Sequence, residues 1–220
     1  MVRRNRVGSG IVYLQVTRGV AKRDHAFPRT VVPSVVATAR SIRPEPRAAQ
    51  AEAGVKVLTL PDIRWQRVDI KSVGLLPSVL AKQQAREAGA FEAWLVDRDG
   101  FVTEGSSSNA WIVAQDGSMI TRNVENAILN GITRVSLLEL ARREGMQIIE
   151  RKFTVAEAKA AREAFTTSAT AFVMPVVQID ERVIGNGQPG SVARRLRDLY
   201  LQHAKGTGAQ SSRELTSTPA

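Results

Sequence analysis

The stretch from residue 102 to 134 constrains this chain most, because it combines a carboxylate with a strongly marked helix start. Glu104 ends a short apolar segment and precedes a turn of one glycine and three serines. An Asn-Gly pair at 130–131 then stands directly before a helical pattern over 132–143. A helix that opens in this way leaves several backbone N–H groups free, and Thr133 places a hydroxyl beside them. The segment therefore predicts an anion site, for which phosphate is the usual ligand.

The carboxylate of Glu104 adds a second requirement. A buried carboxylate needs a cationic or N–H partner to stay ionised. Pyridoxal phosphate would meet both requirements, because it carries a phosphate at one end and a pyridine nitrogen at the other. The residues alone leave a plainer interpretation open: the Gly-Ser turn is typical of a polar loop, and Asn-Gly is typical of a helix N-cap.

The composition argues against several other kinds of site. There is no cysteine, which excludes disulfides and thiol nucleophiles, and two histidines are too few for a histidine-based metal site. No apolar run is long enough to span a membrane. The net charge of +10 is scattered in small clusters that do not alternate with aromatic residues, which argues against a nucleic-acid partner. We expect a metal-free cytoplasmic protein whose positive field suits anionic ligands. A basic nucleic-acid-binding protein remains a weaker alternative, which salt-sensitive retention on DNA would test.

Apolar periodicity and turn residues predict a mixed α and β chain. The predicted strands cover residues 10–19, 31–37, 55–60, 91–96, 101–103, 110–113, 118–121 and 147–151, with a further apolar strand after the hydroxyl-rich run 165–170. The predicted helices cover residues 75–88, 132–144, 154–161 and 191–205, of which 154–161 begins with a capping box formed by Thr154 and Glu157. Residues 45–53 are rich in Pro, Ala and charge and predict a connector between a small domain (1–44) and a large domain (54–205). The tail 206–220 is rich in Ser, Thr and Gly, and we expect it to be disordered.

Lys71 is the candidate nucleophile. It lies at a predicted strand-to-helix transition and is flanked by apolar residues. A lysine that loses hydration there can react with a carbonyl to form a Schiff base. Lysines near helix starts are common, however, and Lys82 is an equal candidate on the residues alone.

The spacing of the 102–134 stretch resembles the signature of the class IV, or fold type IV, pyridoxal-phosphate aminotransferases. That signature has a Glu, a small residue two positions on, an Asn five positions on, an apolar-x-Thr and an apolar-x-Gly-apolar-x-Arg. The matching residues are Glu104, Ser106, Asn109, Met119 with Thr121, Leu129, Gly131, Ile132 and Arg134. Trp111 departs from the pattern, because the family usually has Phe or Tyr there.

The resemblance implies an α+β fold, with a small N-terminal α/β domain and a large domain built on a β pseudo-barrel with flanking helices. It implies that Lys71 rather than Lys82 carries the cofactor and moves the proton, and that Glu104 keeps the pyridine nitrogen protonated. The cofactor-binding residues that it implies are Lys71, Glu104, Ser108, Asn109, Leu129, Gly131, Ile132, Thr133, Ser168, Ala169 and Thr170. Many relatives have Thr where Ala169 stands, so the hydroxyl donor in that turn is expected from Ser168 or Thr170.

Residues 18–28 resemble a loop of the D-amino-acid aminotransferases, in which an Arg and a His reach across a homodimer to bind the substrate carboxylate. The corresponding residues of this chain are Arg23 and His25. Without the resemblance, the sequence around them indicates only an exposed charged loop. The expected reaction moves an amino group between a D-amino acid of the D-alanine type and a 2-oxo acid. Branched-chain L-amino-acid aminotransferases and aminodeoxychorismate lyases share the core signature and are the alternatives.

One departure from the family is large. The family has a further N-terminal segment that includes most of the small domain, an Arg that contacts the phosphate and a Tyr of the carboxylate trap. The sequence therefore resembles an N-terminally truncated member with an incomplete small domain. This makes an inactive fragment a competing prediction, since a sheet missing its neighbours exposes apolar edges.

Overall fold

The computed structural model describes the backbone of residues 1–216 and the side chains of residues 1–206, and the chain divides into two units. The first unit covers Met1–Ala48 and the second begins at Ala49. The boundary falls within the helix α1 (Glu45–Ala53), which occupies the predicted connector. This helix was not predicted, although its sequence is rich in alanine and has Pro46 in the first turn, where the missing N–H breaks no helical hydrogen bond.

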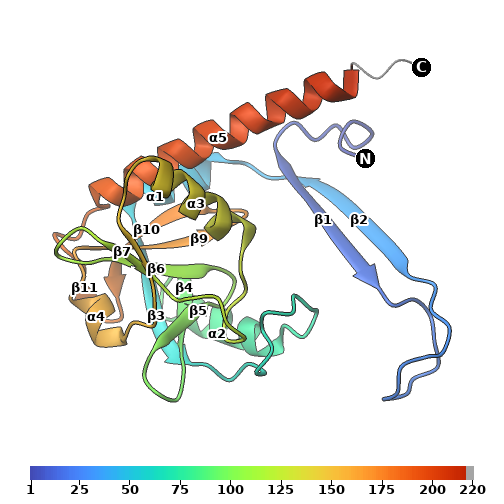
Figure 1. Cartoon of the computed structure of the whole chain (residues 1–220), viewed down its shortest axis with the longest axis horizontal. Coiled ribbons are helices and arrows are strands. Elements are labelled where there is room, and N and C mark those ends of the chain that lie inside the picture. Colours follow the sequence, from blue (N-terminus) through green and yellow to red (C-terminus); the bar gives the residue numbers. More distant parts are fainter. Residues whose placement is uncertain (217–220) are drawn as a thin grey trace. The chain divides into compact units, whose positions relative to one another are not determined.

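The first unit is a two-stranded antiparallel ribbon (Figure 1). Strand β1 (Gly10–Thr17) pairs with β2 (Ser34–Ser41) in a register that runs from Gly10 opposite Ser41 to Thr17 opposite Ser34. Apart from the start of α1, its described residues contain no helix. The second strand begins three residues later than predicted because Pro33 lacks the N–H that a ladder needs.

The second unit is built on a nine-stranded mixed sheet that curls into a half-barrel (Figure 1). The strand order is β5-β4-β3-β10-β9-β6-β7-β8, and β11 pairs with β10. Parallel pairs join β3 to β4, β3 to β10 and β7 to β8, and the other neighbours are antiparallel. The strands are β3 (Val55–Pro61), β4 (Glu92–Val96), β5 (Val102–Gly105), β6 (Asn109–Val113), β7 (Met119–Thr121), β8 (Ile148–Glu150), β9 (Glu163–Ser168), β10 (Phe172–Ile179) and β11 (Arg182–Val183).

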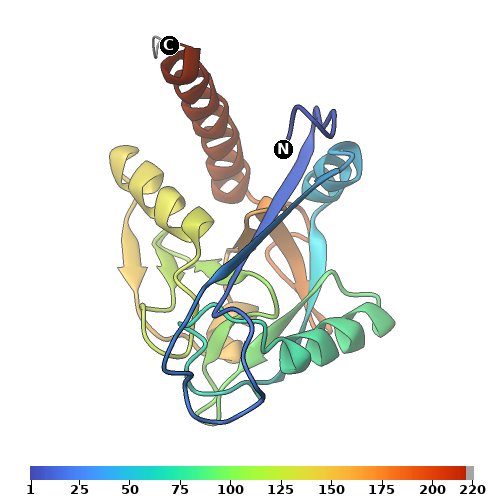
Figure 2. The same cartoon turned by 90° about the vertical axis from the view of Figure 1, so that its right-hand side faces the viewer.

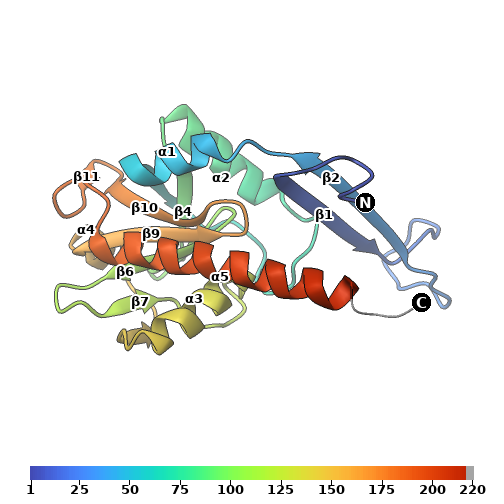
Figure 3. The same cartoon turned by 90° about the horizontal axis from the view of Figure 1, so that it is seen from above.

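Helices pack on this sheet at different places. Figure 3 shows α3 (Ile132–Arg143) and α5 (Ser191–Thr216) on one side of the sheet, where Leu137 and Leu196 join a cluster around Trp111. Figure 2 shows α2 (Leu76–Glu87) away from α3, and its buried alanines pack against β4. The short helix α4 (Val155–Lys159) begins with the predicted capping box, which the structure confirms.

The C-terminal helix is longer than the sequence predicted. Helix α5 continues to Thr216 instead of ending near residue 205. No proline follows Ser191 until Pro219, so the sequence contains no strong helix breaker over that range. Residues 217–220 of the predicted disordered tail lie outside the described residues. Among the helices that the structure describes, none is long and apolar enough to cross a bilayer.

Candidate active site

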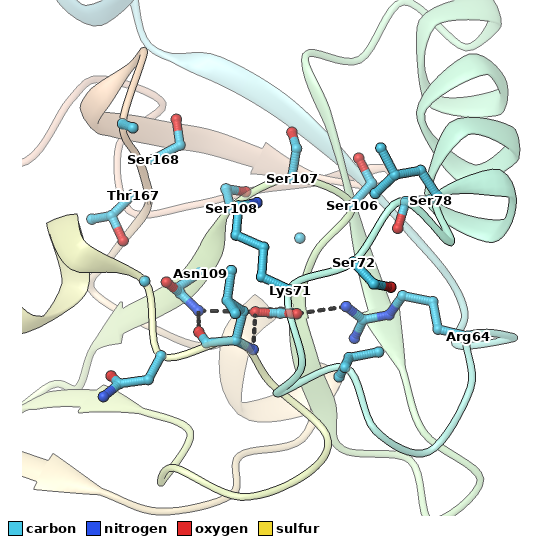
Figure 4. Close-up of a pocket in the computed structure, with 18 of the residues that line it drawn as sticks. Arg64, Lys71, Ser72, Ser78, Ser106, Ser107, Ser108, Asn109, Thr167 and Ser168 are labelled. Atoms are coloured by element: carbon cyan, nitrogen blue, oxygen red, sulfur yellow. Dashed lines mark hydrogen bonds and ion pairs between the residues drawn. The ribbon is translucent and has the colours of Figure 1, made fainter. Parts of the chain in front are cut away.

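The second unit contains a cavity of about 520 Å³ that is formed entirely by its own residues (Figure 4). Its walls come from the loop 62–75, the serine turn 105–108, the start of α3 and the turn after β9. Ten of the predicted cofactor-binding residues line it: Lys71, Glu104, Ser108, Asn109, Leu129, Gly131, Ile132, Thr133, Ser168 and Ala169. Residues that lie far apart in the sequence are thus brought to one site.

Glu104 lies at the end of β5 with its carboxylate buried among three donors. Arg64 Nη1 donates to its Oε1 at 2.5 Å, while the backbone N–H of Leu129 donates to Oε2 at 3.0 Å. Asn109 Nδ2 also donates to Oε2, at 2.9 Å, and to the backbone oxygen of Leu129 at 2.8 Å. The cation and N–H partners expected for this carboxylate are therefore present in the protein itself.

Burial raises the pKa of Glu104 to about 7, because desolvation of the carboxylate outweighs the ion pair with Arg64 and the Leu129 N–H, which lower it. Arg64 in turn is held by Asp62, through Nε to Oδ1 at 2.9 Å and Nη2 to Oδ2 at 2.7 Å. A carboxylate offers about four acceptor positions, and three of those on Glu104 are occupied. Glu104 can therefore accept one more hydrogen bond from a cavity occupant.

The start of α3 is the donor end of the cavity. Its N-cap is Gly131, no side chain caps it, and its first turn has no acidic residue. The hydroxyl of Thr133 is buried and has no hydrogen-bond partner among the described residues. Gly131 is required by packing, because a Cβ there would lie 2.6 Å from Asn109 Oδ1. Free N–H groups beside an unpaired buried hydroxyl fit an anionic group.

The turn after β9 contributes only part of what was predicted. Ser168 and Ala169 line the cavity, and the Ser168 hydroxyl accepts a hydrogen bond from the N–H of Ala171 at 3.2 Å. Thr170 is exposed and is not among the lining residues, so its role as a phosphate ligand stays a prediction. Thr167, which was not predicted as a cofactor ligand, also lines the cavity.

Lys71 lines the cavity, but its local structure differs from the prediction. No strand precedes it: β3 ends at Pro61, and residues 62–75 form a loop that leads into α2. The lysine is exposed, so the expected desolvation by flanking apolar residues is absent. The flanking Ile70 and Val73 are themselves exposed, which explains the difference. Lys82 lies elsewhere, on α2, where it donates to the backbone oxygen of Phe91 at 2.6 Å.

Arg23 and His25 belong to the first unit and lie in the exposed loop between β1 and β2. Within this loop, Asp24 Oδ1 accepts a hydrogen bond from the N–H of His25 at 2.6 Å, and the guanidinium of Arg18 stacks 3.7 Å from the centre of the Phe27 ring. Arg23 and His25 themselves are exposed to solvent.

Comparisons with known proteins agree with the geometry of the site. The family model for class IV amino-transferases matches residues 1–179. The chain belongs to the class IV aminotransferases. It is 44% identical over 193 residues to the D-alanine aminotransferase of Bacillus licheniformis. The aligned region covers 88% of this chain and 67% of the relative. It is 42% identical over 205 residues to the D-alanine aminotransferase of Staphylococcus aureus strain N315. That alignment covers 92% of this chain and 71% of the relative.

Solved structures confirm the fold type IV architecture of this class IV aminotransferase. A branched-chain amino acid aminotransferase of T.th., solved with pyridoxamine 5′-phosphate, superposes with a TM-score of 0.82 at 31% identity, covering 93% of this chain and 68% of that one. The 4-amino-4-deoxychorismate lyase of Pseudomonas aeruginosa has a TM-score of 0.76 at 28% identity, covering 87% and 70%. The chain thus spans about two thirds of the length of the relatives that it matches.

Class IV aminotransferases use pyridoxal phosphate, and the residues of this cavity fit that cofactor. The uncapped start of α3 with the unpaired hydroxyl of Thr133 suits its phosphate. The buried carboxylate of Glu104 suits a protonated ring nitrogen. The described residues contain no cluster of three or more His, Cys, Asp or Glu side chains that could hold a metal ion.

Arg64 is the main residue that sequence reasoning missed. A cationic or N–H partner was expected beside Glu104, but no spacing rule selects Arg64, which stands 40 positions earlier. The signal that was available was chemical: a buried carboxylate requires a partner, and Arg64 lies in the loop that also carries Lys71.

Proposed function

We propose that this chain is a pyridoxal-phosphate-dependent aminotransferase that exchanges an amino group between a D-amino acid of the D-alanine type and a 2-oxo acid such as 2-oxoglutarate. The observation that carries the proposal is that one cavity brings together Lys71, Glu104 and the uncapped start of α3. The identity to D-alanine aminotransferases over most of the chain supports a D-amino-acid substrate. The branched-chain enzymes support the fold.

The donor end of the cavity would hold the cofactor phosphate. The N–H groups of Ile132 and Thr133, together with the Thr133 hydroxyl, would donate to its oxygens, and Ser168 and Ala169 would border it from the turn after β9. This arrangement would satisfy the one buried hydroxyl that lacks a partner among the described side chains. It also explains why the first turn of α3 has no acidic residue, since a carboxylate there would repel a phosphate.

The other end would hold the ring. Glu104 would accept a hydrogen bond from the ring nitrogen and keep it protonated, while Asn109 and the Leu129 N–H fix the carboxylate. Leu129 would pack against the ring, and Ser108 would border it. When bound, the cofactor supplies an electron sink for charge that develops on the α-carbon of an amino acid.

Lys71 would anchor the cofactor covalently and, when its amine is free, would take a proton from the substrate and return it as a general acid–base. Arg23 and His25 would bind the substrate carboxylate in the neighbouring subunit of a homodimer. Exposed apolar side chains of the Lys71 loop and α2 that do not line the cavity support such a dimer. They are Ile63, Val73, Leu76, Val79 and Leu80. A cytoplasmic location remains a prediction from the sequence.

Amino transfer by the purified full chain tests the proposal. The chain is incubated with pyridoxal phosphate, 2-oxoglutarate and either D-alanine or L-leucine, and glutamate is measured. Glutamate formed from D-alanine but not from L-leucine supports the proposal. Glutamate from L-leucine alone would favour the branched-chain alternative. No product from either amino acid would mean that this chain is inactive as it stands. Sedimentation of the same sample tests the dimer.

A further inference from the structure

Glu92 is a buried carboxylate that contacts the site without lining it. It lies on β4, is 1% exposed and is not among the cavity residues. Five donors converge on its two oxygens. They are the hydroxyls of Ser106 (2.5 Å), Ser107 (2.9 Å) and Ser108 (3.0 Å), the N–H of Ala93 (2.9 Å) and the ammonium of Lys82 (3.2 Å).

These contacts fix the direction of the serine hydrogens. A hydroxyl has one hydrogen and two lone pairs. Ser106 and Ser107 each direct their hydrogen to Glu92, away from the cavity that they line. The serine turn therefore offers lone pairs to the cavity. Ser108 differs, because its Oγ also lies 2.6 Å from Thr166 Oγ1, which can donate to the backbone oxygen of Asn109 at 2.9 Å. Ser106 and Ser107 therefore present the free acceptor positions.

The cavity is thus polarised. The start of α3 offers donors, and the serine turn offers acceptors. Two cationic side chains line the cavity, Arg64 and Lys71. Arg64 is fully engaged by Asp62 and Glu104, whereas Lys71 has no ion-pair partner among the described residues. Figure 4 shows Lys71 within the cavity together with Ser106, Ser107 and Ser108.

We propose that Glu92 is a positioning residue that orients the serine turn so that Ser106 and Ser107 accept hydrogen bonds from the free ammonium of Lys71. Glu92 itself is held in place by Lys82 of α2 and by the close approach of Gly105, where a Cβ would lie 3.1 Å from Glu92 Cγ and 2.2 Å from Ser108 Oγ.

This inference rests on the role proposed above for Lys71, but its test needs no cofactor. The full chain without cofactor is treated with limiting acetic anhydride at one fixed pH, and acetylation of Lys71 is measured by peptide mass spectrometry relative to the exposed Lys22. Hydrogen bonds to Ser106 and Ser107 would restrain the Lys71 amine and hinder its attack on the anhydride. Glu92→Gln places an amide donor among the serines, so at least one hydroxyl hydrogen turns toward the cavity. Lys71 acetylation should rise at least about threefold, since hydrogen bonds to charged groups are among the stronger ones.

Two further measurements separate positioning from loss of structure. Ser106→Ala with Ser107→Ala removes the acceptors directly and should raise Lys71 acetylation to a similar extent, even where Glu92→Gln does not fold. Glu163→Gln is the matched control, because Glu163 is also buried and accepts the N–H groups of Val192 and Ala193 at the start of α5, away from the cavity. It should lower the melting temperature and leave Lys71 acetylation unchanged.

The inference is overturned by folded Glu92→Gln and double-serine variants that acetylate Lys71 at the wild-type rate. It is also overturned by an equal increase in Glu163→Gln. If the wild-type chain transfers amino groups but Lys71 acetylation is unchanged in the variants, this inference is wrong and the proposed function stands. If acetylation changes as expected but the chain transfers no amino group, the proposed function is wrong and this inference stands.

Discussion

Arg64 Nη1 donates to Glu104 Oε1 across 2.5 Å, although the two residues stand 40 positions apart. The contact joins the loop that carries Lys71 to the end of the strand that carries Glu104. Asp62 holds the other side of the guanidinium, so Arg64 lies between two carboxylates and none of the three side chains is more than 12% exposed. This group of charges keeps Glu104 fixed beside the cavity.

Replacing Arg64 should lower the free energy of unfolding. Arg64→Met leaves Asp62 and Glu104 buried without their cation, and losing one partner of a buried ion pair costs about 3–5 kcal/mol. We expect urea unfolding at pH 8 to show a loss of about 3 kcal/mol. Arg67→Met is the matched control, because Arg67 pairs with Asp69 on the surface. Equal unfolding midpoints for the two variants would contradict this account of the Arg64 group.

Glu104 should make the stability of the cofactor-free chain depend on pH. Its pKa is about 7 in the folded chain against an ordinary 4.5, so between these values the folded chain binds more protons than the unfolded chain. Stability contributed by this group is therefore greatest below pH 4.5 and is lost as pH rises through 7, by as much as about 3 kcal/mol. Glu104→Gln should flatten this part of the curve of unfolding free energy against pH. An unchanged slope would contradict the raised pKa.

Thr133→Val tests the anion site. The hydroxyl of Thr133 is buried and unpaired, so replacing it with a methyl group should leave the cofactor-free chain equally stable or stabilise it by about 1 kcal/mol. The same change should weaken pyridoxal phosphate binding roughly tenfold, because the phosphate loses one donor. Calorimetric titration and thermal melting measure the two effects. Reduced stability together with unchanged affinity would show that the hydroxyl serves the fold.

Gly131→Ala should disturb both ends of the cavity. An added Cβ would lie 2.6 Å from Asn109 Oδ1, so Asn109 must move, and Asn109 holds Glu104 and the backbone oxygen of Leu129. We expect a loss of about 1–3 kcal/mol in stability, as for other overpacked sites, and at least tenfold weaker cofactor binding. Gly89→Ala is the comparison, since nothing lies within 4 Å of a Cβ at that surface glycine, although its positive φ adds some strain.

Much of the fold could be predicted because local rules decide it. Turn residues placed the hairpins, with Gly100 and Gly117 at positive φ, and the capping box of Thr154 and Glu157 marked the start of α4. The helix α1 was missed because its proline suggested a break, and the extent of α5 was missed because glycine does not by itself end a helix. In both helices the effect of proline or glycine depends on its position within the helix, which apolar periodicity does not indicate.

The site could be predicted in part. The spaced signature located Glu104, Asn109 and the start of α3 in one cavity. It did not find Arg64 or Glu92, because their contacts join segments that pair only in the folded sheet. It also expected a desolvated Lys71, whereas the loop 62–75 leaves this residue exposed. Burial by tertiary contact was the property that the sequence alone did not determine.

The proposed function depends on the binding of pyridoxal phosphate by Lys71 in this cavity. The most direct measurement is an absorbance titration of the full chain with pyridoxal phosphate, alongside Lys71→Ala and the control Lys152→Ala, whose lysine does not line the cavity. We expect a new long-wavelength band in the wild type and in Lys152→Ala, but not in Lys71→Ala. A band that persists in folded Lys71→Ala, or that is absent from the folded wild-type chain, would contradict the account.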